Sequence, residues 1–249
     1  MLKKLENKIR QYFPKHLHNA SEYVKALKGL KGIEIGGPSQ IFTGKGLLPV
    51  YATIKELDGC NFSNDTVWEG KLIEGNTYQY LKGKLPGHQF ISAGDNLSGI
   101  KNNTYDFVLS CHNLEHFANP IKALYEWKRI VKQDGYLLLV LPNKEKTFDH
   151  NRPVTTIEHL LSDHKNNTPE TDETHFEESL LLHDRTMDAG ISSNEELRKR
   201  IYNNIENRCM HHHVFDANLV KILMKDTNFE IIAMDLLQIH IFVLAKNLK

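Results

Sequence analysis

From Gly29 onward the chain alternates short apolar runs with segments of helical periodicity, and this alternation limits the fold more than any other feature. Residues 32–36, 105–110 and 135–141 are apolar runs of strand length. Such short apolar runs are typical of strands buried on both faces of a sheet, and helices between them allow parallel pairing. The pattern predicts an α/β fold in which helices cover a seven-stranded, mostly parallel sheet.

The best-marked helix follows the central strand. Asn119 is placed to cap its first turn, Pro120 suits the first helical position, and one face is apolar through Ile121, Leu124, Trp127 and Val131. Near the C-terminus, a predicted helix over 217–226 precedes two β-rich runs, 229–237 and 239–245. Their close spacing predicts an antiparallel hairpin at the edge of the sheet.

Two segments lie outside this alternation. Residues 1–28 carry apolar side chains at helical spacing, which predicts an amphipathic helical cap through Leu2, Leu5, Ile9, Tyr12 and Phe13. Residues 143–213 are rich in His, Asp, Glu, Asn and Thr, with helical stretches near 156–163 and 194–207. Because a long polar insertion in a compact α/β domain is more often a binding element than filler, we expect one domain over 1–249 in which 143–213 forms a lid over the active face.

Charge and cysteine content limit the partners and the compartment. Lys and Arg total 31, as do Asp and Glu, so no overall field draws the chain to nucleic acid or to an anionic membrane. The three cysteines form no Cys-x-x-Cys pair, which argues against a disulfide scaffold or a cysteine-rich zinc site. The N-terminus lacks the apolar core of a signal peptide, and no stretch approaches the length of a membrane span. We therefore expect a cytoplasmic protein without a nucleic-acid or membrane partner.

The sharpest local signal is segment 32–39. Its strand carries Glu34 two positions before the glycine pair Gly36 and Gly37, and Pro38 and Ser39 follow. Glycine lets the backbone turn tightly and approach a ligand, and ligands of doubly wound sheets bind beyond the carboxyl ends of the strands. The fuller Gly-x-Gly-x-x-Gly loop of dinucleotide enzymes is absent. The loop predicts a ligand site without a pyrophosphate cradle, although an ordinary strand-to-helix turn fits it about equally well.

Further polar residues follow the later strands in order. Asp58, or as second choice Asn61, would end the second strand with a group that accepts hydrogen bonds from ribose hydroxyls. The segment Asp95-Asn96-Leu97 could read the amino group and a ring nitrogen of adenine. The central strand then leads into Cys111, His112 and Leu114-Glu115-His116.

This series resembles the class I S-adenosylmethionine-dependent methyltransferases, specifically their broad type 11 group, of the kind that accompanies bacterial glycan or natural-product gene clusters. The likeness covers residues 29 to 143 well and the C-terminal hairpin loosely, and its motifs are the loop at 32–39, Leu114-Glu115-His116, Asn119-Pro120 and the stretch from Arg129 to Gly135. It implies a Rossmann-like fold and S-adenosylmethionine as cofactor. By match of motif, Glu34 and Gly36 would contact the methionine part, Asp58 the ribose and Asp95 to Leu97 the adenine. We expect the same site to include Gly37, Pro38, Ser39, Asn61 and Cys111.

Two departures from the family's pattern keep an alternative open. The loop reads Gly36-Gly37-Pro38 where the family more usually has Gly-x-Gly-x-Gly, and the acid of the second strand is shifted or replaced. The alternative is a non-catalytic Rossmann-like interaction module, which the presence of Glu34, Asp95 and Glu115-His116 argues against. An NAD(P)-dependent oxidoreductase is disfavoured because the Gly-x-Gly-x-x-Gly loop is absent, and a nucleic-acid methyltransferase because there is neither a basic stripe nor an Asn-Pro-Pro-Tyr motif.

Methyl transfer from a sulfonium needs an acceptor held in line and, for a hydroxyl acceptor, a group that removes its proton. The candidates for this base are His112 and His116, which follow the central strand in the sequence, and His159 in the insertion. For His116 a purely structural role is equally open. If residues 211–213 form a strand, either His211 and His213 or His212 alone would face the site.

The remaining polar residues of the insertion complete the predicted site. We expect His150, Arg152 and His212 to bind the acceptor, Arg152 through a carboxylate or phosphate. No ligand-spacing signature is present, so we expect no metal. The predicted function is O-methylation of a small polar acceptor such as a sugar or glycan end.

Overall fold

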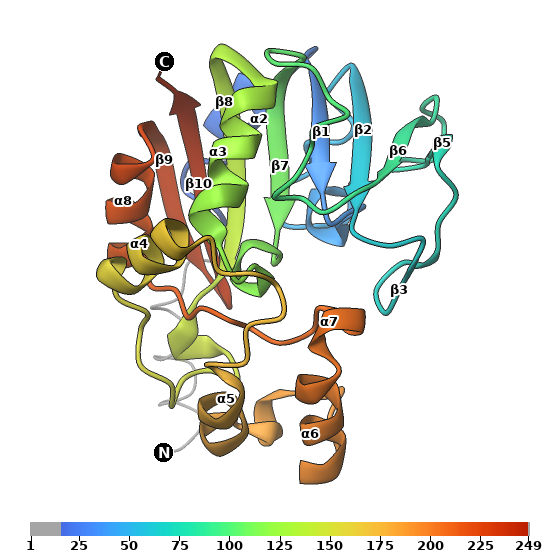
Figure 1. The fold of residues 1–249 in the computed structure, drawn as a ribbon. Helices are drawn as coiled ribbons and strands as arrows, with labels where there is room; N and C mark the ends of the chain where they lie inside the picture. The colour runs from blue at the N-terminus through green and yellow to red at the C-terminus, as the bar shows by residue number, and fades with distance from the viewer. Residues whose placement is uncertain (1–15, 249) are drawn as a thin grey trace, which may run out of the picture.

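The computed structural model describes residues 16–248, and Figure 1 shows the central sheet with helices on both faces. The strands of this sheet, in the spatial order β5-β6-β2-β1-β7-β8-β10-β9, are β5 Gly75–Tyr78, β6 Gly87–Ile91, β2 Glu56–Asn61, β1 Lys31–Ile35, β7 Tyr105–Cys111, β8 Val131–Pro142, β10 His240–Asn247 and β9 Phe229–Leu237. The five strands from β6 to β8 are mutually parallel. The expected α/β fold with a mostly parallel sheet is confirmed.

The sheet has eight strands, one more than the sequence predicts. The additional strand, β5, pairs antiparallel with β6 at one edge. Its sequence, Gly-Asn-Thr-Tyr, has no apolar run, and only Tyr78 is buried, so the pattern gave no strand signal. At the other edge the predicted hairpin is confirmed: β9 and β10 pair antiparallel, and Gln238, with φ at +55°, forms the turn between them.

Both predicted helices are present: one follows the central strand and the other precedes the C-terminal hairpin. Helix α3, Pro120–Ile130, begins at Asn119, whose side chain accepts a hydrogen bond from the backbone N–H of Lys122, as the sequence predicts. Helix α8 spans Ala217–Asp226 and is capped in the same way by Asp216. Both helices bury an apolar face against the sheet, which contributes to a core around Trp127 and Leu223.

A second core fills the opposite face of the sheet. Helix α2, Ala20–Leu27, packs there through Tyr23 and Leu27, and the Tyr23 hydroxyl donates to the Asp235 carboxylate at 2.7 Å. The segment between β1 and β2 contains only a short 3-10 helix, η1 Gln40–Phe42, yet it buries Phe42 and Tyr51 in the same core. The N-terminal cap is therefore present over 20–27, whereas the predicted contacts of Leu2 to Phe13 lie outside the described residues.

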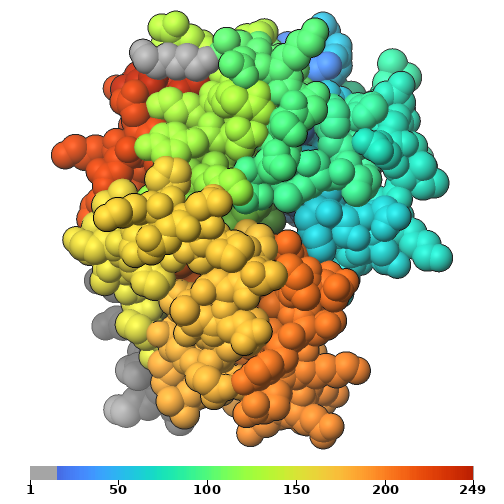
Figure 2. All heavy atoms as spheres, viewed as in Figure 1, coloured from blue at the N-terminus to red at the C-terminus, as the bar shows by residue number. Residues whose placement is uncertain are grey.

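The polar segment 143–213 folds into short helices that lie beyond the carboxyl ends of the parallel strands (Figure 1). It packs a small core of its own, made of Phe176, Ile191, Leu197, Ile201 and Met210. In Figure 2 its orange atoms meet the cyan atoms of the segment that follows β2. The helices are η3 Lys144–Lys146, α4 Ile157–Asn166, α5 Phe176–Leu182, η4 Arg185–Met187, α6 Asn194–Tyr202 and α7 Asn204–Asn207.

Two smaller elements complete the description. A two-stranded ribbon, β3 Asp65–Thr66 and β4 Gly70–Lys71, follows β2, and the 3-10 helix η2 Leu114–His116 follows β7. Within residues 16–248, no helix is both long enough and apolar enough to cross a membrane.

Candidate active site

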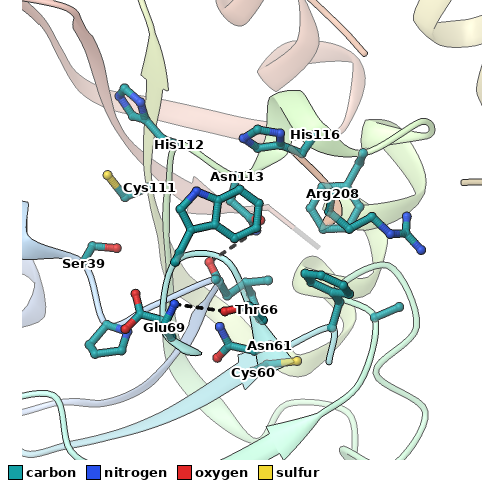
Figure 3. Close-up of a pocket in the computed structure, with 18 of the residues that line it drawn as sticks. Ser39, Cys60, Asn61, Thr66, Glu69, Cys111, His112, Asn113, His116 and Arg208 are labelled. Carbon is teal, nitrogen blue, oxygen red and sulfur yellow. Dashed lines mark hydrogen bonds between the residues drawn. The ribbon is translucent and has the colours of Figure 1, made fainter. Parts of the chain in front are cut away.

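A cavity of about 460 Å³ opens at the carboxyl ends of β1, β2, β6 and β7. Strand β1 lies between β2 and β7, so the chain reverses its direction of progress across the sheet at this point, where ligands of open α/β sheets bind. Figure 3 shows Ser39, Asn61, Asn113 and His116 arranged around the cavity. Of the predicted cofactor residues, those that line it are Gly36, Pro38, Ser39, Asn61, Asp95 and Cys111.

The loop after β1 forms one wall of this donor cavity. Gly36 has φ at +82°, in the left-handed region that side chains disfavour, and its N–H donates to the Cys60 carbonyl oxygen at 2.9 Å. A Cβ atom at Gly36 would lie 2.9 Å from Cγ of Asn113, which follows β7. The glycine therefore allows the loop to pass close to the central strand while its backbone faces the cavity.

Glu34 holds the loop from inside and does not line the cavity. Its direct contact with the cofactor stays a prediction. The hydroxyls of Tyr51 and Tyr78 donate to its carboxylate at 2.5 and 2.7 Å, and Ser39 donates to it through Oγ at 2.6 Å. Complete burial raises the pKa of Glu34. Gly37 does not line the cavity either. A Cβ atom there would overlap the Glu34 carboxyl group.

The second strand places Asn61, and not Asp58, at the cavity. Asn61 is the last residue of β2 and lines the cavity, with its Oδ1 accepting from Gln89 Nε2 at 3.1 Å. Asp58 lies three residues earlier, and its two carboxylate oxygens accept from the His88 N–H and the Tyr105 hydroxyl, each at 2.8 Å. The second choice for the ribose ligand therefore lines the cavity, and the first choice does not.

The loop after β6 presents Asp95 to the cavity, where its carboxylate pairs with Lys122 at 2.9 Å. The indole N–H of Trp127 donates to the Gly94 carbonyl oxygen at 2.8 Å and so fixes this loop against α3. Asn96 and Leu97 do not line the cavity. Asn96 is exposed on the turn, and Leu97 points into the core, so only the first residue of the predicted adenine segment faces the ligand space.

Aromatic and charged residues that the sequence did not single out complete the donor cavity. Phe62 and Phe117 line it, and the Arg208 guanidinium lies over the Phe62 ring at 5.6 Å from the centroid. Arg208 also pairs with Glu170, whose pKa is raised to about 6 by burial. Arg208 and Glu170 belong to the insertion, and contacts between segments this distant in the chain leave no local sequence signal.

A second cavity, of about 300 Å³, adjoins the first and is lined largely by residues of the insertion. Three side chains, Trp68, His112 and His116, line both cavities. Trp68 reaches this wall from the ribbon of β3 and β4, and its ring lies 5.5 Å from that of His116. We call this second space the acceptor cavity.

His112 and His116 keep neutral rings at the wall between the cavities. Nε2 of His112 lies 2.8 Å from Nδ1 of His240, and burial lowers the pKa of His112 to about 3. Nδ1 of His116 lies 3.0 Å from the Met210 carbonyl oxygen, and burial lowers the pKa of His116 well below its usual range. Because a carbonyl oxygen can only accept, Nδ1 of His116 carries the hydrogen and Nε2 retains a lone pair.

A buried carboxylate lies beside this lone pair. Both oxygens of Glu115 are buried without a hydrogen-bond partner among residues 16–248, and burial raises the pKa of Glu115 to about 7. Its Oε1 lies 3.9 Å from Nε2 of His116 and 3.9 Å from Nε2 of His211. His211 in turn holds Nδ1 2.5 Å from Asp149. Glu115 and Asp149 were not predicted as site residues, whereas His211 was one of the two alternatives for segment 211–213.

Four predicted acceptor-side residues lie outside both cavities. Arg152 is buried and pairs with Asp149 at 3.0 Å and with Glu178 at 2.9 Å. Its guanidinium also donates to the backbone carbonyl oxygens of residues 211 and 212. His212 is buried, with its Nε2 3.1 Å from the side-chain nitrogen of Asn204. His150 pairs with Asp184, and His159 lies in another histidine cluster. In this structure the four side chains make contacts within and around the insertion, and their roles toward the acceptor stay predictions.

Comparisons with known proteins agree with this geometry. A family model described as a methyltransferase domain matches residues 73–139. A solved S-adenosylmethionine-dependent methyltransferase from Mesorhizobium loti is 10% identical, with a TM-score of 0.51 over 91% of this chain and 95% of that one. A protein from Listeria monocytogenes is 13% identical, with the same TM-score of 0.51 over 93% and 96%. At these identities the two structures show the fold alone.

A curated relative adds a short match. An uncharacterized protein of Methanocaldococcus jannaschii is 48% identical over 46 residues, which cover 18% of this chain and 20% of that protein. The chain thus spans about a fifth of the length of that relative.

The fold, the cavity at the reversal of strand order and the family match define a class I methyltransferase fold. Over residues 73–139 the chain is similar to a methyltransferase domain, and its fold is similar to that of the S-adenosylmethionine-dependent methyltransferase from Mesorhizobium loti.

Proposed function

We propose that the protein transfers the methyl group of S-adenosylmethionine to a hydroxyl of a small polar acceptor, such as a sugar or a glycan end. The observation that carries this proposal is the shared wall: Trp68, His112 and His116 line both cavities, so a donor in one space meets an acceptor in the other at these side chains. Bound S-adenosylmethionine supplies an electrophilic methyl group on a positively charged sulfur.

The donor cavity offers partners for each part of the cofactor. The backbone at Gly36 and the hydroxyl of Ser39 would meet the methionine part, and the Asn61 amide the ribose hydroxyls. Phe62 and Phe117 offer aromatic surface for the adenine, with Asp95 near its amino group. With these partners, the two ends of the cofactor would lie on loops from different strands, with the sulfur between them.

The acceptor cavity suits a molecule with both apolar and polar faces. Trp68 and Phe148 line it with aromatic surface, on which the C–H face of a sugar ring can pack. Lys146 and Arg200 bring positive charge, whereas Glu115, His116 and His211 bring hydrogen-bond acceptors. A hydroxyl-rich acceptor can satisfy these polar groups without carrying a charge of its own.

His116 is the group best placed to take the acceptor proton. Its Nδ1 is fixed by the Met210 carbonyl oxygen, so Nε2 can accept a proton from a hydroxyl as the oxygen attacks the methyl group. The O–H bond breaks, the new O–CH₃ bond forms, and the S–CH₃ bond pair returns to sulfur, which leaves neutral S-adenosylhomocysteine. The Glu115 carboxylate, 3.9 Å from Nε2, would stabilise the imidazolium that results.

The test is turnover with a panel of acceptors. The purified protein is incubated with S-adenosylmethionine and sugars, nucleotide sugars, phenols or amines, and S-adenosylhomocysteine is quantified; the methylated atom is then identified by NMR. We expect product only with hydroxyl acceptors, and a methyl ether in its spectrum. Methylation of an amine or a carbon atom by preference would contradict the proposed acceptor class.

The matched variants are His116→Ala and His150→Ala. His116→Ala should lower kcat by about 100-fold or more while cofactor affinity changes little, because a positioned base typically contributes about 10²–10⁴-fold. His150→Ala, which changes a histidine of the insertion outside both cavities, should leave kcat within about twofold of wild type. Equal losses in the two variants would mean that His116 has a structural role only.

A further inference from the structure

A second cluster of histidines lies in the insertion, apart from both cavities. His159 and Asp163 are one turn apart on α4, His175 directly precedes α5, and His213 lies in the segment between α7 and α8. One nitrogen from each histidine lies within 4.8 Å of the others. None of the four residues lines the donor or the acceptor cavity, so the proposed methyl transfer gives them no role.

We propose that His159, Asp163, His175 and His213 form a tetrahedral Zn²⁺ site that holds the insertion together. Zinc in structural sites of proteins takes four ligands of this kind, imidazole nitrogen and carboxylate oxygen, at about 2.0–2.2 Å. Four ligands at those distances from one ion are separated from each other by about 3.3–3.6 Å along the edges of the tetrahedron.

The measured separations are close to those edges. Nε2 of His159 lies 3.0 Å from Nε2 of His175 and 3.3 Å from Oδ2 of Asp163. Oδ2 of Asp163 lies 3.6 Å from Nε2 of His213. The three histidines thus gather around one point, and the Asp163 carboxylate lies next to two of them, His159 and His213.

One candidate ligand atom of the cluster, Oδ2 of Asp163, has no hydrogen-bond donor among the described residues. Oδ2 of Asp163 is buried and accepts no hydrogen bond from residues 16–248, whereas its Oδ1 accepts from the Thr168 hydroxyl at 3.0 Å. In a metal-free cluster, one of the two histidines His159 and His175 must donate to the other, and His213 donates to the Ala118 carbonyl oxygen at 3.2 Å. A divalent cation would satisfy Oδ2 and use the lone pairs of His159 and His175 that now face each other. His213 would exchange its hydrogen bond to the Ala118 carbonyl oxygen for the bond from Nε2 to the metal.

A cation can reach this point and would link distant parts of the chain. The His159 side chain is 39% exposed, which leaves a path from solvent, while that of His213 is 1% exposed. The four ligands join α4, the start of α5 and the segment that carries His211 into the acceptor cavity. Because all four tetrahedral positions come from the protein, the ion would have no open position for a substrate, and its role would be structural.

The other candidate position for a cation in the described part of the chain fits zinc less well. Glu115, His116 and His211 also have ligand atoms within 4.8 Å of one another, but the two histidines each lie 3.9 Å from the same carboxylate oxygen, beyond a tetrahedral edge. The test must therefore distinguish the two groups.

The experiment measures zinc in the purified full-length protein by mass spectrometry, after growth in zinc-supplemented medium and desalting. We expect about one Zn²⁺ per chain in wild type, in Glu115→Gln and in His164→Ala. His164 is the matched control, since it is on α4 next to Asp163 and its ring contacts Tyr125 at 5.3 Å. His175→Ala and Asp163→Asn should lose zinc, with affinity weakened by more than the roughly 10–100-fold typical of an outer-shell partner.

A second measurement remains decisive if these variants fail to fold. Wild-type protein stripped with a chelator should unfold at a lower temperature, and the midpoint should recover with Zn²⁺ but not with Mg²⁺; Co²⁺ in its place should give the visible absorption of a tetrahedral site. A zinc-free wild type that binds no added Zn²⁺, or loss of zinc in Glu115→Gln with retention in His175→Ala, would overturn the proposal. Either result is independent of whether an acceptor is methylated.

Discussion

Asn113, which follows β7, packs directly against the backbone of Gly36, which follows β1: its Cγ would lie 2.9 Å from a Cβ atom at that glycine. Its amide nitrogen also donates to the Ile35 carbonyl oxygen at 3.3 Å. The ends of the two central strands are thus in contact at the point where the donor cavity begins, and the glycine is required by both space and backbone conformation.

Gly36→Val should therefore weaken cofactor binding. The valine side chain would overlap Asn113 in a conformation, φ at +82°, that β-branched residues avoid. We expect S-adenosylhomocysteine affinity to fall by 10-fold or more, about 1.4 kcal/mol, measured by isothermal titration calorimetry. Gly44→Val is the control, because no atom lies within 4 Å of a Cβ there. Unchanged affinity in Gly36→Val would show that the cofactor binds elsewhere.

Asn61→Ala should affect cofactor binding, whereas Asp58→Asn should affect stability. Asn61 lines the donor cavity, so its loss should weaken S-adenosylhomocysteine binding by about 10-fold, the value of one hydrogen-bonded contact. Asp58 bonds to β6 and to Tyr105 away from the cavity, so Asp58→Asn should lower the free energy of unfolding by about 1–3 kcal/mol without changing affinity. Calorimetry and urea denaturation on both variants separate the two roles. Weaker binding in Asp58→Asn alone would restore Asp58 as the ribose ligand.

Glu34→Gln should destabilise the protein through the loop. Its carboxylate accepts from Tyr51, Tyr78 and Ser39, and a glutamine amide nitrogen cannot accept. We expect about 1–3 kcal/mol of lost stability by urea denaturation, together with weaker cofactor binding because the loop is one wall of the cavity. Glu56→Gln, whose carboxylate is 49% exposed, should cost less than about 1 kcal/mol. Equal stability of the two variants would show that Glu34 does not stabilise the loop after β1.

Arg152→Met should destabilise the insertion, while acceptor binding by the protein that remains folded should be unchanged. The substitution removes a buried cation and leaves Asp149 without its partner at 3.0 Å, a change that typically costs about 3–5 kcal/mol. A lower thermal midpoint is the expected result. Arg185→Met provides the control, since that side chain is half-buried and makes only a solvent-exposed hydrogen bond to the Ser192 carbonyl oxygen. A variant as stable as wild type with a raised KM for the acceptor would favour the role predicted from the sequence.

Much of the fold could be predicted because its signals are local. The cap of α3 at Asn119, the helix at 217–226 and the hairpin of β9 and β10 each depend on residues within a few positions of one another. The same holds for the loop at Gly36, since one strand and one glycine pair specify it. Strand β5 was missed because its stability comes from pairing with β6 and not from its own sequence.

The side chains of the site depend on register and on distant contacts, which a single sequence does not contain. The run Leu57 to Phe62 could end at Asp58 or at Asn61; only the pairing of Cys60 with Ile35 and with Phe90 places Asn61 at the carboxyl end. In the insertion, the polar composition predicted a binding surface. Yet Arg152 is buried against Glu178 and the backbone of residue 212, which are 26 and 60 residues away. His212 is buried against Asn204, and His211 is the residue that reaches the acceptor cavity.

Titration calorimetry of the purified protein with S-adenosylhomocysteine, with NAD as the control ligand, tests the central claim most directly. Binding of S-adenosylhomocysteine at one site in the micromolar range, weakened in Gly36→Val, and no binding of NAD is the predicted result. No heat from S-adenosylhomocysteine with the folded protein, or binding that Gly36→Val leaves intact, would contradict the assignment of the donor cavity.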